Sequence, residues 1–579
     1  MGGVIRPDGR TRSACVLGRV AVASPRTGAV PDGRLKCPPE PARPAAALPP
    51  AAGHGYGPKM VQRTGETERK YEAAAGVTDP RPDLDGLPDV TATRTLEPVE
   101  LDAVYYDTAG LALAAHRVTL RRRTGGDDAG WHLKLPTAKA DTRTEVRAPL
   151  GDDAAQGAPA AGNAGEEAIT GATGHAVLPA ELRAEVAALT RGRPLHPVVR
   201  LRTTRRRILL LDHDGRTLAE IAHDTVTSQA RDAAPASWSE TEVELYEGGP
   251  ALLDAVEERL AHAGLHRSAS PSKLARALGG GVLAPPPAGP DLPPTAGRTA
   301  TAYLRRQLAA LLALDPAARR AEEDAVHRMR VATRRARSAL KSFRKELDRT
   351  TTDPVADELK WLAGVLGTAR DREVLTERLG RRLDELDPAR TDHRLRHRLL
   401  DDDTPTATRH AAAPPELDGA RYFALLDALE ALLAAPPYTP AADAPAAEAA
   451  RATVRRDHDR LRHAVETALA LPPGQERDTA LHEARKDAKR ARYSSEAAQP
   501  VLGPAAAAHS ARMKTVQQLL GEHQDSVMCR TALADLRDHA VRAGEDPAPY
   551  DALDHRERQI AADVETALPA AWRDADQPL

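Results

Sequence analysis

The chain has 579 residues, too many for one hydrophobic core, so two or three domains are expected. Its 81 Lys and Arg against 83 Asp and Glu give a net charge of −2, which excludes a simple polycation and requires any basic site to be local. Three widely spaced cysteines exclude a disulfide framework and suit a reducing cytoplasm, and the absence of a long apolar run excludes a membrane span.

Residues 1–59 are rich in Pro, Gly, Ala and Arg and have no periodic apolar pattern. This composition is typical of disorder, because it cannot bury enough apolar surface to offset the lost conformational entropy. Met60 follows directly, and the ordered pattern begins a few residues later. Met60 is therefore a second candidate for the start of translation.

Residues 60–278 are predicted to form one mostly β domain. Short segments with β-branched or aromatic residues, such as VELDAVYYDT and RTLAEIAHDTV, are separated by Gly, Asp and Pro. Helical patterns occur at 180–190 and 250–263, and a stretch rich in Gly, Ala and Asp at 150–176 is predicted to be a loop.

Residues 279–297, GGGVLAPPPAGPDLPPTAG, are predicted to be a semi-rigid linker, because Pro and Gly exclude regular structure. From 298 to 579 almost every segment has a helical pattern, with breaks at 401–416 and 435–446. The predicted fold class is therefore α+β, with a β domain followed by an all-α domain.

The helical half contains an internal repeat. The segment VHRMRVATRRARSALKSF (326–343) resembles LHEARKDAKRARYSSEAA (481–498), and VLGTARDREVL resembles LLGEHQDSVMC. The matching pairs are His327 with His482, Arg330 with Arg485, Arg334 with Lys489, Arg337 with Arg492, Gly367 with Gly521 and Asp371 with Asp525. Two copies of one helical unit indicate an organised domain.

A basic stripe follows one side of the repeated helix. In the first copy it comprises His327, Arg330, Arg334, Arg337 and Lys341. An apolar stripe lies nearly opposite and is predicted to pack inward; it comprises Met329, Ala332, Ala336, Leu340 and Phe343. A solvated face would explain one such helix. The same His and cationic positions in the second copy favour anion binding instead.

Charges also alternate along the predicted strands. In ETERK, Glu66, Glu68 and Lys70 occupy every second position and share one strand face. The same pattern occurs in TLRRRT, TRTEVR, LAEIAHD and SETEVEL. One such strand is ordinary surface, but several in one antiparallel domain predict the interior of a closed barrel or tunnel.

A charged interior is costly unless it binds a charged ligand. Carboxylates are ligands for a hard cation such as Mg²⁺, and Arg and Lys bind phosphate oxygens. The mixture therefore predicts a complex of metal and polyphosphate as the ligand. The chain has no G-x-x-x-x-G-K-[ST] sequence, which excludes a P-loop enzyme.

The β half resembles a CYTH domain, the fold of the triphosphate tunnel metalloenzymes. The resemblance rests on the order and spacing of Glu66-x-Glu68-x-Lys70, YYDT, Arg121-x-Arg123, Lys134, Arg143-x-Glu145, Asp224, Glu240-x-Glu242-x-Glu244 and SPSKLARAL. It implies an eight-stranded antiparallel tunnel that hydrolyses a linear triphosphate with Mg²⁺ or Mn²⁺.

The resemblance also implies residue roles. The phosphate-binding residues would be Lys70, Arg121, Arg123, Lys134, Arg143, Arg205 and Lys273, although strand alternation equally allows Arg207 in place of Arg205. The residues that hold metal or orient water would be Glu66, Glu68, Asp224, Glu242 and Glu244. Glu66 and Glu68 are the favoured catalytic residues.

The helical half resembles a CHAD domain, whose hallmark is helices with such His and basic positions. CHAD domains are associated with binding inorganic polyphosphate, and the two domains are known in tandem in one family. The residues that would bind polyphosphate are the basic stripe of the first copy together with His482, Arg485, Lys489 and Arg492.

Together the resemblances imply a cytoplasmic, metal-dependent triphosphatase that acts on inorganic triphosphate or short polyphosphate and is associated with polyphosphate granules. Two alternatives stay open: a non-catalytic polyphosphate-binding protein, and a tunnel enzyme for an organic triphosphate such as thiamine triphosphate or ATP. Few aromatic residues accompany the basic ones, which disfavours nucleic acid as a partner because bases could not stack. No membrane partner is expected.

Overall fold

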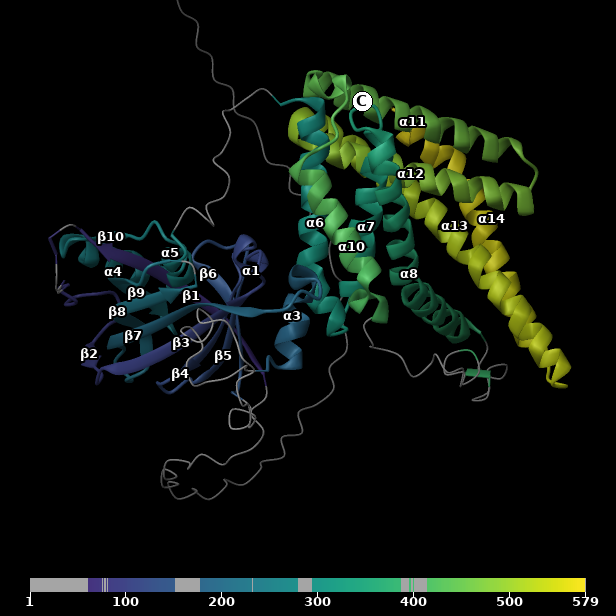
Figure 1. Cartoon of the computed structure of the whole chain (residues 1–579). Helices are drawn as coiled ribbons and strands as arrows, with labels where there is room; N and C mark the ends of the chain where they lie inside the picture. Colours follow the sequence, from purple (N-terminus) through teal and green to yellow (C-terminus); the bar gives the residue numbers. More distant parts are fainter. Residues whose placement is uncertain are drawn as a thin grey trace, which may run out of the picture. The chain divides into compact units, whose positions relative to one another are not determined.

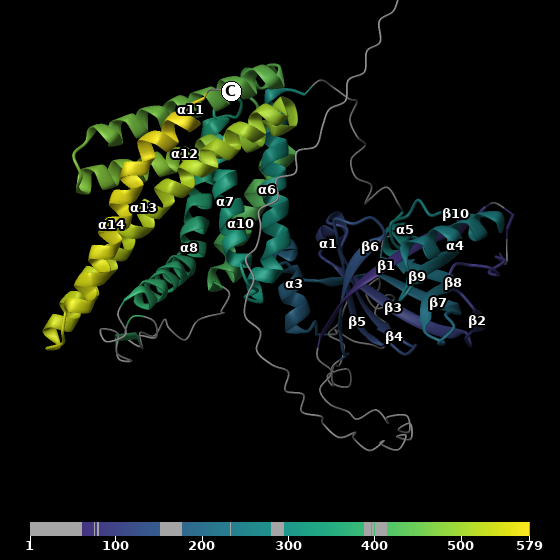
Figure 2. The same cartoon turned by 180° about the vertical axis from the view of Figure 1, so that it is seen from behind.

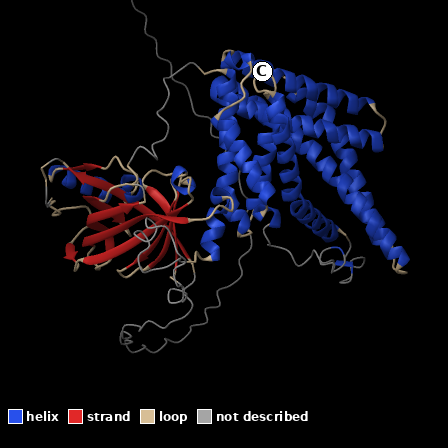
Figure 3. Ribbon diagram, in the orientation of Figure 1, coloured by secondary structure: helices blue, strands red, loops and turns tan. Residues whose placement is uncertain are grey.

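The computed structural model describes residues 61–74, 82–150, 177–231, 233–279, 294–386 and 414–577, together with a few isolated positions. The segment 1–59, nearly all of the predicted 150–176 loop and most of the 279–297 linker lie outside the described residues. Strands occur only before residue 279 of this described part, and long helices fill the part after 294. Figure 3 colours the strands red and the helices blue. The predicted α+β class is confirmed. Among the described helices, none has an apolar stretch long enough to cross a bilayer.

Eight antiparallel strands close into a barrel in the order β1-β6-β5-β4-β3-β7-β8-β9, because β9 pairs back with β1 (Figure 1). Their bounds are β1 Gln62–Ala73, β3 Val99–Asp107, β4 Thr119–Thr124, β5 Gly130–Pro136, β6 Thr142–Ala148, β7 His196–Leu211, β8 Thr217–Ala230 and β9 Ala236–Leu245. Two short strands that the sequence did not indicate, β2 (Ala92–Thr95) and β10 (Leu265–Arg267), pair with β7 and β1 outside this ring.

The apolar core of the β domain lies outside the barrel. In the described part of this domain four helices accompany the strands: α1 (Ala112–Ala115), α3 (Ala180–Thr190), α4 (Pro250–His262) and α5 (Lys273–Ala277). Val256 of α4 packs with Val243 of β9, and Val186 of α3 belongs to the cluster around Trp131 of β5. Because side chains alternate along a strand, apolar residues that pack outward leave the polar residues between them pointing into the barrel.

The helical half is built from long helices that pack as successive neighbours; Figure 2 shows them from behind. Their bounds are α6 Ala296–Arg319, α7 Ala325–Ser342, α8 Arg349–Glu385, α10 Ala420–Ala434, α11 Ala446–Ala470, α12 Gln475–Leu502, α13 Pro504–Arg542 and α14 Ala548–Ala575. The two copies of the repeat place their basic stripes on α7 and α12. The predicted apolar stripe of α7 is buried at all five positions, from Met329 to Phe343.

Candidate active site and basic helical surface

The barrel contains a polar cavity of about 60 Å³. The predicted phosphate-binding residues all line it: Lys70, Arg121, Arg123, Lys134, Arg143, Arg205 and Lys273. Of the predicted metal or catalytic residues, Glu66, Glu68, Glu242 and Glu244 line it too. Asp224 is fully buried behind them and accepts hydrogen bonds from Arg205. The structure thus brings the predicted tunnel residues together, and their roles stay predictions.

The register of β1 explains why two acids and a lysine alternate along it. Glu66 lies opposite Arg143 of β6, while Glu68 and Lys70 lie opposite Glu244 and Glu242 of β9. All three β1 side chains face the cavity. Residues 66–70 therefore lie at the closure of the barrel, and their charges meet partners from both adjacent strands.

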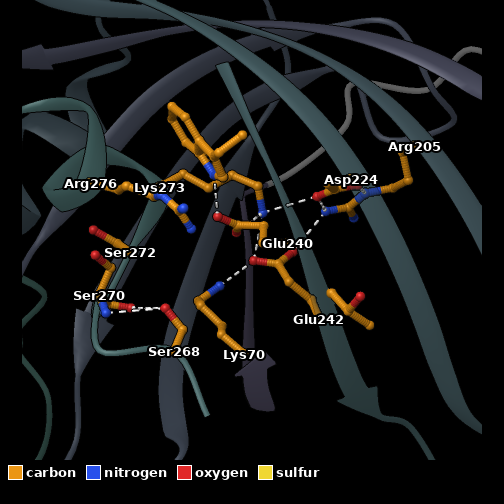
Figure 4. A network of polar contacts seen from close by, with 12 residues as sticks. Lys70, Arg205, Asp224, Glu240, Glu242, Ser268, Ser270, Ser272, Lys273 and Arg276 are labelled. Atoms are coloured by element: carbon orange, nitrogen blue, oxygen red, sulfur yellow. Dashed lines mark hydrogen bonds and ion pairs between the residues drawn. The ribbon is translucent and has the colours of Figure 1, made fainter. Parts of the chain in front are cut away.

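One group of carboxylates in the cavity is neutralised by cations from within the chain (Figure 4). Lys273 Nζ lies 3.0 Å from Asp224, 2.8 Å from Glu240 and 2.6 Å from Glu242. Arg205 donates to Asp224 at 2.7 Å and to Glu242 at 2.8 Å. These attractions outweigh burial and hold the pKa of Asp224 and of Glu242 below the usual range.

Lys273 reaches this position because of the local structure of its helix. Ser272 caps α5 by accepting a hydrogen bond from the amide of Ala275 at 3.1 Å. The cap starts the helix at Lys273, whose side chain points inward and is only 8 % exposed. Helix α5 therefore supplies the cavity with a cation that no strand provides.

A second group of carboxylates surrounds Glu244. Glu68 faces Glu244 directly across β1 and β9, and like charges in that position repel. Burial, and then the neighbouring Glu66, Glu68 and Glu145, raise the pKa of Glu244 to about 8. A divalent cation would relieve this repulsion, and oxygen ligands are those that Mg²⁺ and Mn²⁺ prefer. The residues present therefore fit such an ion.

Glu68 differs from Glu244 because two lysines lie beside it. Lys134 Nζ is 2.7 Å from Glu66 and 3.4 Å from Glu68, and Lys70 is 3.2 Å from Glu68. Burial opposes ionisation of Glu68, but Lys134 and Lys70 outweigh it and lower its pKa to about 2. Glu68 is therefore ionised at neutral pH, whereas Glu244 can keep a proton until a cation replaces it.

The sequence left open whether Arg205 or Arg207 enters the cavity. Arg205 lines the cavity and binds two carboxylates. Arg207 is absent from the described lining, and its guanidinium lies 3.6 Å from the exposed Asp127. The structure therefore supports Arg205 as the tunnel arginine.

Sequence reasoning did not assign roles to several other cavity residues, among them Glu145, Arg147 and Asp128. Glu145 is 1 % exposed and is bound at 3.0 Å by Nδ1 of His132, a buried histidine whose Nε2 lies 2.9 Å from a backbone carbonyl. His132 therefore fixes the orientation of Glu145. The period-two pattern in TRTEVR already contained the signal for Glu145 and Arg147.

A wider cavity of about 500 Å³ shares Glu68, Lys70 and Arg143 with the tunnel cavity and forms a mouth. Its described lining includes the exposed cations Arg117 and Lys139 and the hydroxyls of Ser268 and Ser270. No aromatic side chain is present among these described lining residues. The mouth thus offers hydrogen-bond donors and positive charge but no surface for stacking a planar ring.

The cluster of Asp478, His523 and Glu565 in the helical half also has the geometry of a metal-binding group. Its two carboxylates already pair with cations: Arg477 lies 3.1 Å from Glu565, and Arg530 lies 3.9 Å from Asp478. Both carboxylates of this cluster have a cationic partner, whereas no cation among the described residues lies within ion-pair distance of Glu244.

In the helical half the predicted binding residues form the basic surface, which we define as the stripe of α7 (His327, Arg330, Arg334, Arg337, Lys341) and that of α12 (His482, Arg485, Lys489, Arg492). All except Lys341 are half-buried, not fully solvated. The two helices are neighbours, since Arg335 of α7 lies 3.0 Å from Glu496 of α12. The side chain of the repeat residue Asp371 lies outside the described part.

Lys489 shows that the two stripes meet. Burial, and then Arg485, Arg334 and Arg330, lower its pKa to about 7. Among the described residues, no carboxylate lies within ion-pair distance of Lys489. Lys341 is likewise affected by burial and by Arg337, Arg490 and Lys360, which lower its pKa. Arg490 and Lys360 therefore extend the basic surface beyond the predicted residues.

In the second copy, several predicted binding residues have polar partners. Arg492 donates to Glu496 at 2.9 Å and to Gln517 at 3.2 Å, and Arg485 lies 3.7 Å from Asp525. The Nε atoms of Arg337 and Arg485 are buried and have no hydrogen-bond acceptor among the described residues. Such buried donors are costly unless an acceptor is supplied.

Comparison with known proteins agrees with this architecture. A family model of the CYTH domain matches residues 65–278, and one of the CHAD domain matches residues 302–534. An uncharacterised protein of Mycobacterium tuberculosis, found in two strains, is 38 % identical over 533 residues, which is 88 % of this chain and 96 % of that protein. The chain therefore belongs to the family of proteins in which a CYTH domain precedes a CHAD domain, and the predicted resemblance is confirmed.

The solved structures that resemble this chain each cover less than half of it. PptA from Streptomyces chartreusis is 24 % identical with a TM-score of 0.38, and covers 48 % of this chain and 99 % of its own. The CHAD domain from Ricinus communis is 24 % identical with a TM-score of 0.39, over 49 % and 93 %. The protein HpAC1 from Hippeastrum, described as a putative adenylyl cyclase with dominant triphosphatase activity, is 16 % identical with a TM-score of 0.22, over 37 % and 96 %.

Proposed function

We propose that the CYTH domain hydrolyses inorganic triphosphate or short linear polyphosphate with Mg²⁺ or Mn²⁺, and that the CHAD domain binds inorganic polyphosphate. The observation that carries the proposal is the composition of the tunnel cavity. Among the described residues, eight cationic and six acidic side chains line a space of about 60 Å³. A linear phosphate chain is narrow, highly anionic and metal-binding, and so it satisfies both sets of charges.

The cationic residues would bind and orient the phosphate chain. Arg121 and Arg123 come from β4 and Lys134 from β5, while Arg205 and Lys273 approach from β7 and α5. Donors that surround the chain from several elements can fix the phosphorus atom for in-line attack and stabilise the charge on its oxygens. Phosphoryl transfer depends mainly on this positioning and neutralisation.

Glu66, Glu68, Glu145 and Glu244 are the residues that would hold the metal, because the first three lie close enough to Glu244 to raise its pKa in addition to the effect of burial. A bound Mg²⁺ or Mn²⁺ would withdraw charge from the phosphoryl oxygens and lower the pKa of a bound water. Glu66 or Glu68 would accept the proton of the attacking water, and the low pKa of Glu68 makes it a weak base for that step.

The mouth of the tunnel favours an inorganic substrate over an organic triphosphate. A nucleotide or thiamine triphosphate would place a planar ring beside the phosphates, and rings bind best against aromatic or apolar side chains. The described lining of the mouth contains charged, hydroxyl and small residues and two prolines, but no aromatic side chain. The cationic and hydroxyl side chains of the mouth can bind the additional phosphates of a linear polyphosphate that extends out of the tunnel.

The experiment is a phosphate-release assay of the full chain on triphosphate, longer polyphosphate, ATP and thiamine triphosphate, with Mg²⁺, with Mn²⁺ and with EDTA. We expect release from triphosphate or short polyphosphate only with metal. Turnover in EDTA would refute the metal role, and faster release from ATP or thiamine triphosphate would favour an organic substrate. Binding of polyphosphate without any hydrolysis would identify a non-catalytic polyphosphate-binding protein.

A further inference from the structure

A glycine faces a binding arginine at the same place in both copies of the repeat. A Cβ atom built on Gly367 of α8 would lie 2.8 Å from Nη2 and 3.0 Å from Cζ of Arg330 on α7. A Cβ atom on the matching Gly521 of α13 would lie 3.5 Å from Nε and Nη2 of Arg485 on α12. The backbone of each glycine thus lies beneath a guanidinium group.

Helix packing does not explain these glycines. Glycine inside a helix is less stable than alanine by about 1 kcal/mol, so its presence needs a reason. Close contact between helix backbones is one common reason, but the three nearest atoms to a Cβ at Gly367 all belong to the Arg330 side chain. Gly364, one turn earlier in the same helix, has nothing within 4 Å of a Cβ.

We infer that Gly367 and Gly521 are positioning residues, which hold Arg330 and Arg485 in the basic surface by leaving space for their guanidinium groups. The inference rests on the proposed polyphosphate binding and assigns a role to residues that themselves contact no ligand. A side chain of sufficient size at either position would push the guanidinium away from Lys489 and Arg334, with which it shares the surface. Phosphate oxygens would then meet fewer converging donors.

The distances from a Cβ atom to the arginine predict that Gly367 and Gly521 tolerate substitution by alanine to different degrees. At Gly367 a contact of 2.8 Å is closer than real Cβ atoms approach, so even alanine must displace the guanidinium. The obstacle is the end of a flexible side chain, and so the fold survives while the arginine moves. At Gly521 an alanine would make an ordinary contact at 3.5 Å, and a longer side chain such as leucine is needed for displacement.

The test compares Gly367→Ala with Gly364→Ala in the full chain. The probe is linear inorganic polyphosphate, titrated by calorimetry over a range of salt concentrations. We expect G367A to lose about tenfold in affinity, the effect of one charge-assisted hydrogen bond, and to show a weaker salt dependence. G364A should bind like the parent. Both variants should keep the helix content, and both should melt no lower than the parent because alanine favours helix.

A rescue experiment separates positioning from a packing defect. Lysine has a slim stem and a compact head, so Arg330→Lys combined with Gly367→Ala should bind more tightly than G367A alone. If packing were the cause, shortening the arginine would not restore affinity. In the second copy, Gly521→Leu should reproduce the loss of affinity seen with G367A.

Three distinguishable outcomes would refute the inference. If Arg330→Ala weakens binding but G367A binds like the parent, polyphosphate binding stands and the positioning role is wrong. If Arg330→Ala and Arg485→Ala both bind like the parent, the proposed polyphosphate site is wrong and the positioning role falls with it. A tenfold loss in G367A accompanied by an equal loss in G364A would also overturn the role.

Discussion

Glu68 and Glu244 face each other across the β1–β9 pairing that closes the barrel. Two carboxylates at such a position destabilise the free protein, and the consequence is a raised pKa for Glu244, to about 8, caused first by burial and then by its acidic neighbours. This pair lies at the closure of the barrel, where the proposed divalent cation would bind. Metal affinity and barrel stability are linked through this pair.

We expect Glu244→Gln to separate these two effects. In EDTA the variant should melt at or above the temperature of the parent, because a buried, repelled carboxyl is removed. With Mg²⁺ or Mn²⁺ the parent should gain more in melting temperature than the variant, since a ligand stabilises the state that binds it. Glu97→Gln, at an exposed position, is the control and should respond to metal like the parent. Equal metal-induced shifts in parent and E244Q would contradict the assignment.

The pH dependence of the same pair has a defined sign. Between pH 4.5 and about 8 the folded state keeps a proton on Glu244 that the unfolded state has lost. This contribution to the free energy of unfolding is present below pH 4.5 and is lost as the pH rises through about 8. Urea titrations in EDTA should therefore show a decline over this range in the parent that is smaller in E244Q. An identical pH profile in both proteins would refute this linkage.

Lys273→Met should strongly destabilise the barrel. The variant leaves Asp224, Glu240 and Glu242 without the ammonium group that lies within 3.0 Å of each. Loss of one partner from a buried ion pair costs about 3–5 kcal/mol. Urea unfolding at neutral pH would measure the loss, and acidification should restore part of the stability because protonation neutralises the carboxylates. Arg94→Met, an exposed cation of the same domain, is the control. A change of less than about 1 kcal/mol would show that Arg205 compensates.

The sequence predicted the tunnel because period-two charge is a local property of a strand. Glu66, Glu68 and Lys70 reveal their shared face without any knowledge of the neighbouring strands. The partners of these charges could not be predicted, since barrel closure places β1 beside β9, far away in the sequence. The division of the acids into a group neutralised by Lys273 and a repelling group around Glu244 is likewise a tertiary result. It depends on where α5 places Lys273 relative to the acidic residues of the barrel.

The helical half shows the same limit. Periodicity predicted both the buried stripe and the basic stripe of α7, because a helix repeats its faces locally. It did not predict that Lys489 would be surrounded by Arg485, Arg334 and Arg330 from two copies of the repeat. The importance of Gly367 also depends on the distance between α7 and α8, which no single-helix pattern contains.

Lys489 predicts how polyphosphate binding depends on pH. Its pKa is lowered to about 7 by burial and by Arg485, Arg334 and Arg330, against the weaker pull of Asp525. Affinity should therefore fall as the pH rises from about 6 to 8, because one cation is lost. Lys489→Arg keeps its charge throughout this range and should flatten the profile. A steep decline that persists in K489R would assign the titration to another group.

The same lysine makes an opposite prediction for stability. Between about pH 7 and pH 10.5 the unfolded chain binds a proton at Lys489 that the folded chain lacks. The free energy of unfolding should therefore rise with pH over this window. Lys489→Met removes this pH dependence and also removes the free-energy cost of burying an ammonium group. The measurement is the melting temperature of K489M and of the parent between about pH 7 and pH 10.5. A melting temperature that rises with pH in the parent but stays constant in K489M would support the low pKa of Lys489. The same rise in both proteins would refute it.

Replacing Arg330, Arg334 and Arg337 with Ala distinguishes a polyanion-binding surface from a solvated face. Three cations are removed while the buried stripe of α7 is untouched, and alanine maintains the helix. We expect a sharp fall in affinity for long-chain polyphosphate and a flatter salt dependence, because fewer counterions are displaced. The set Arg485, Lys489 and Arg492 should show a similar loss.

The matched control replaces three exposed arginines, Arg349, Arg556 and Arg558, which form surface ion pairs elsewhere on the helices. This triple variant changes the net charge equally but leaves the basic surface intact, so its affinity should stay within about twofold of the parent, as expected if surface pairs contribute little. Equal losses in all three triple variants would mean that binding reflects net charge alone. Duplex DNA at the same phosphate concentration is the competing ligand. If the parent binds DNA as tightly as polyphosphate, a nucleic-acid partner is favoured. The backbone phosphates of DNA present the same charge without the flexibility of a linear phosphate chain.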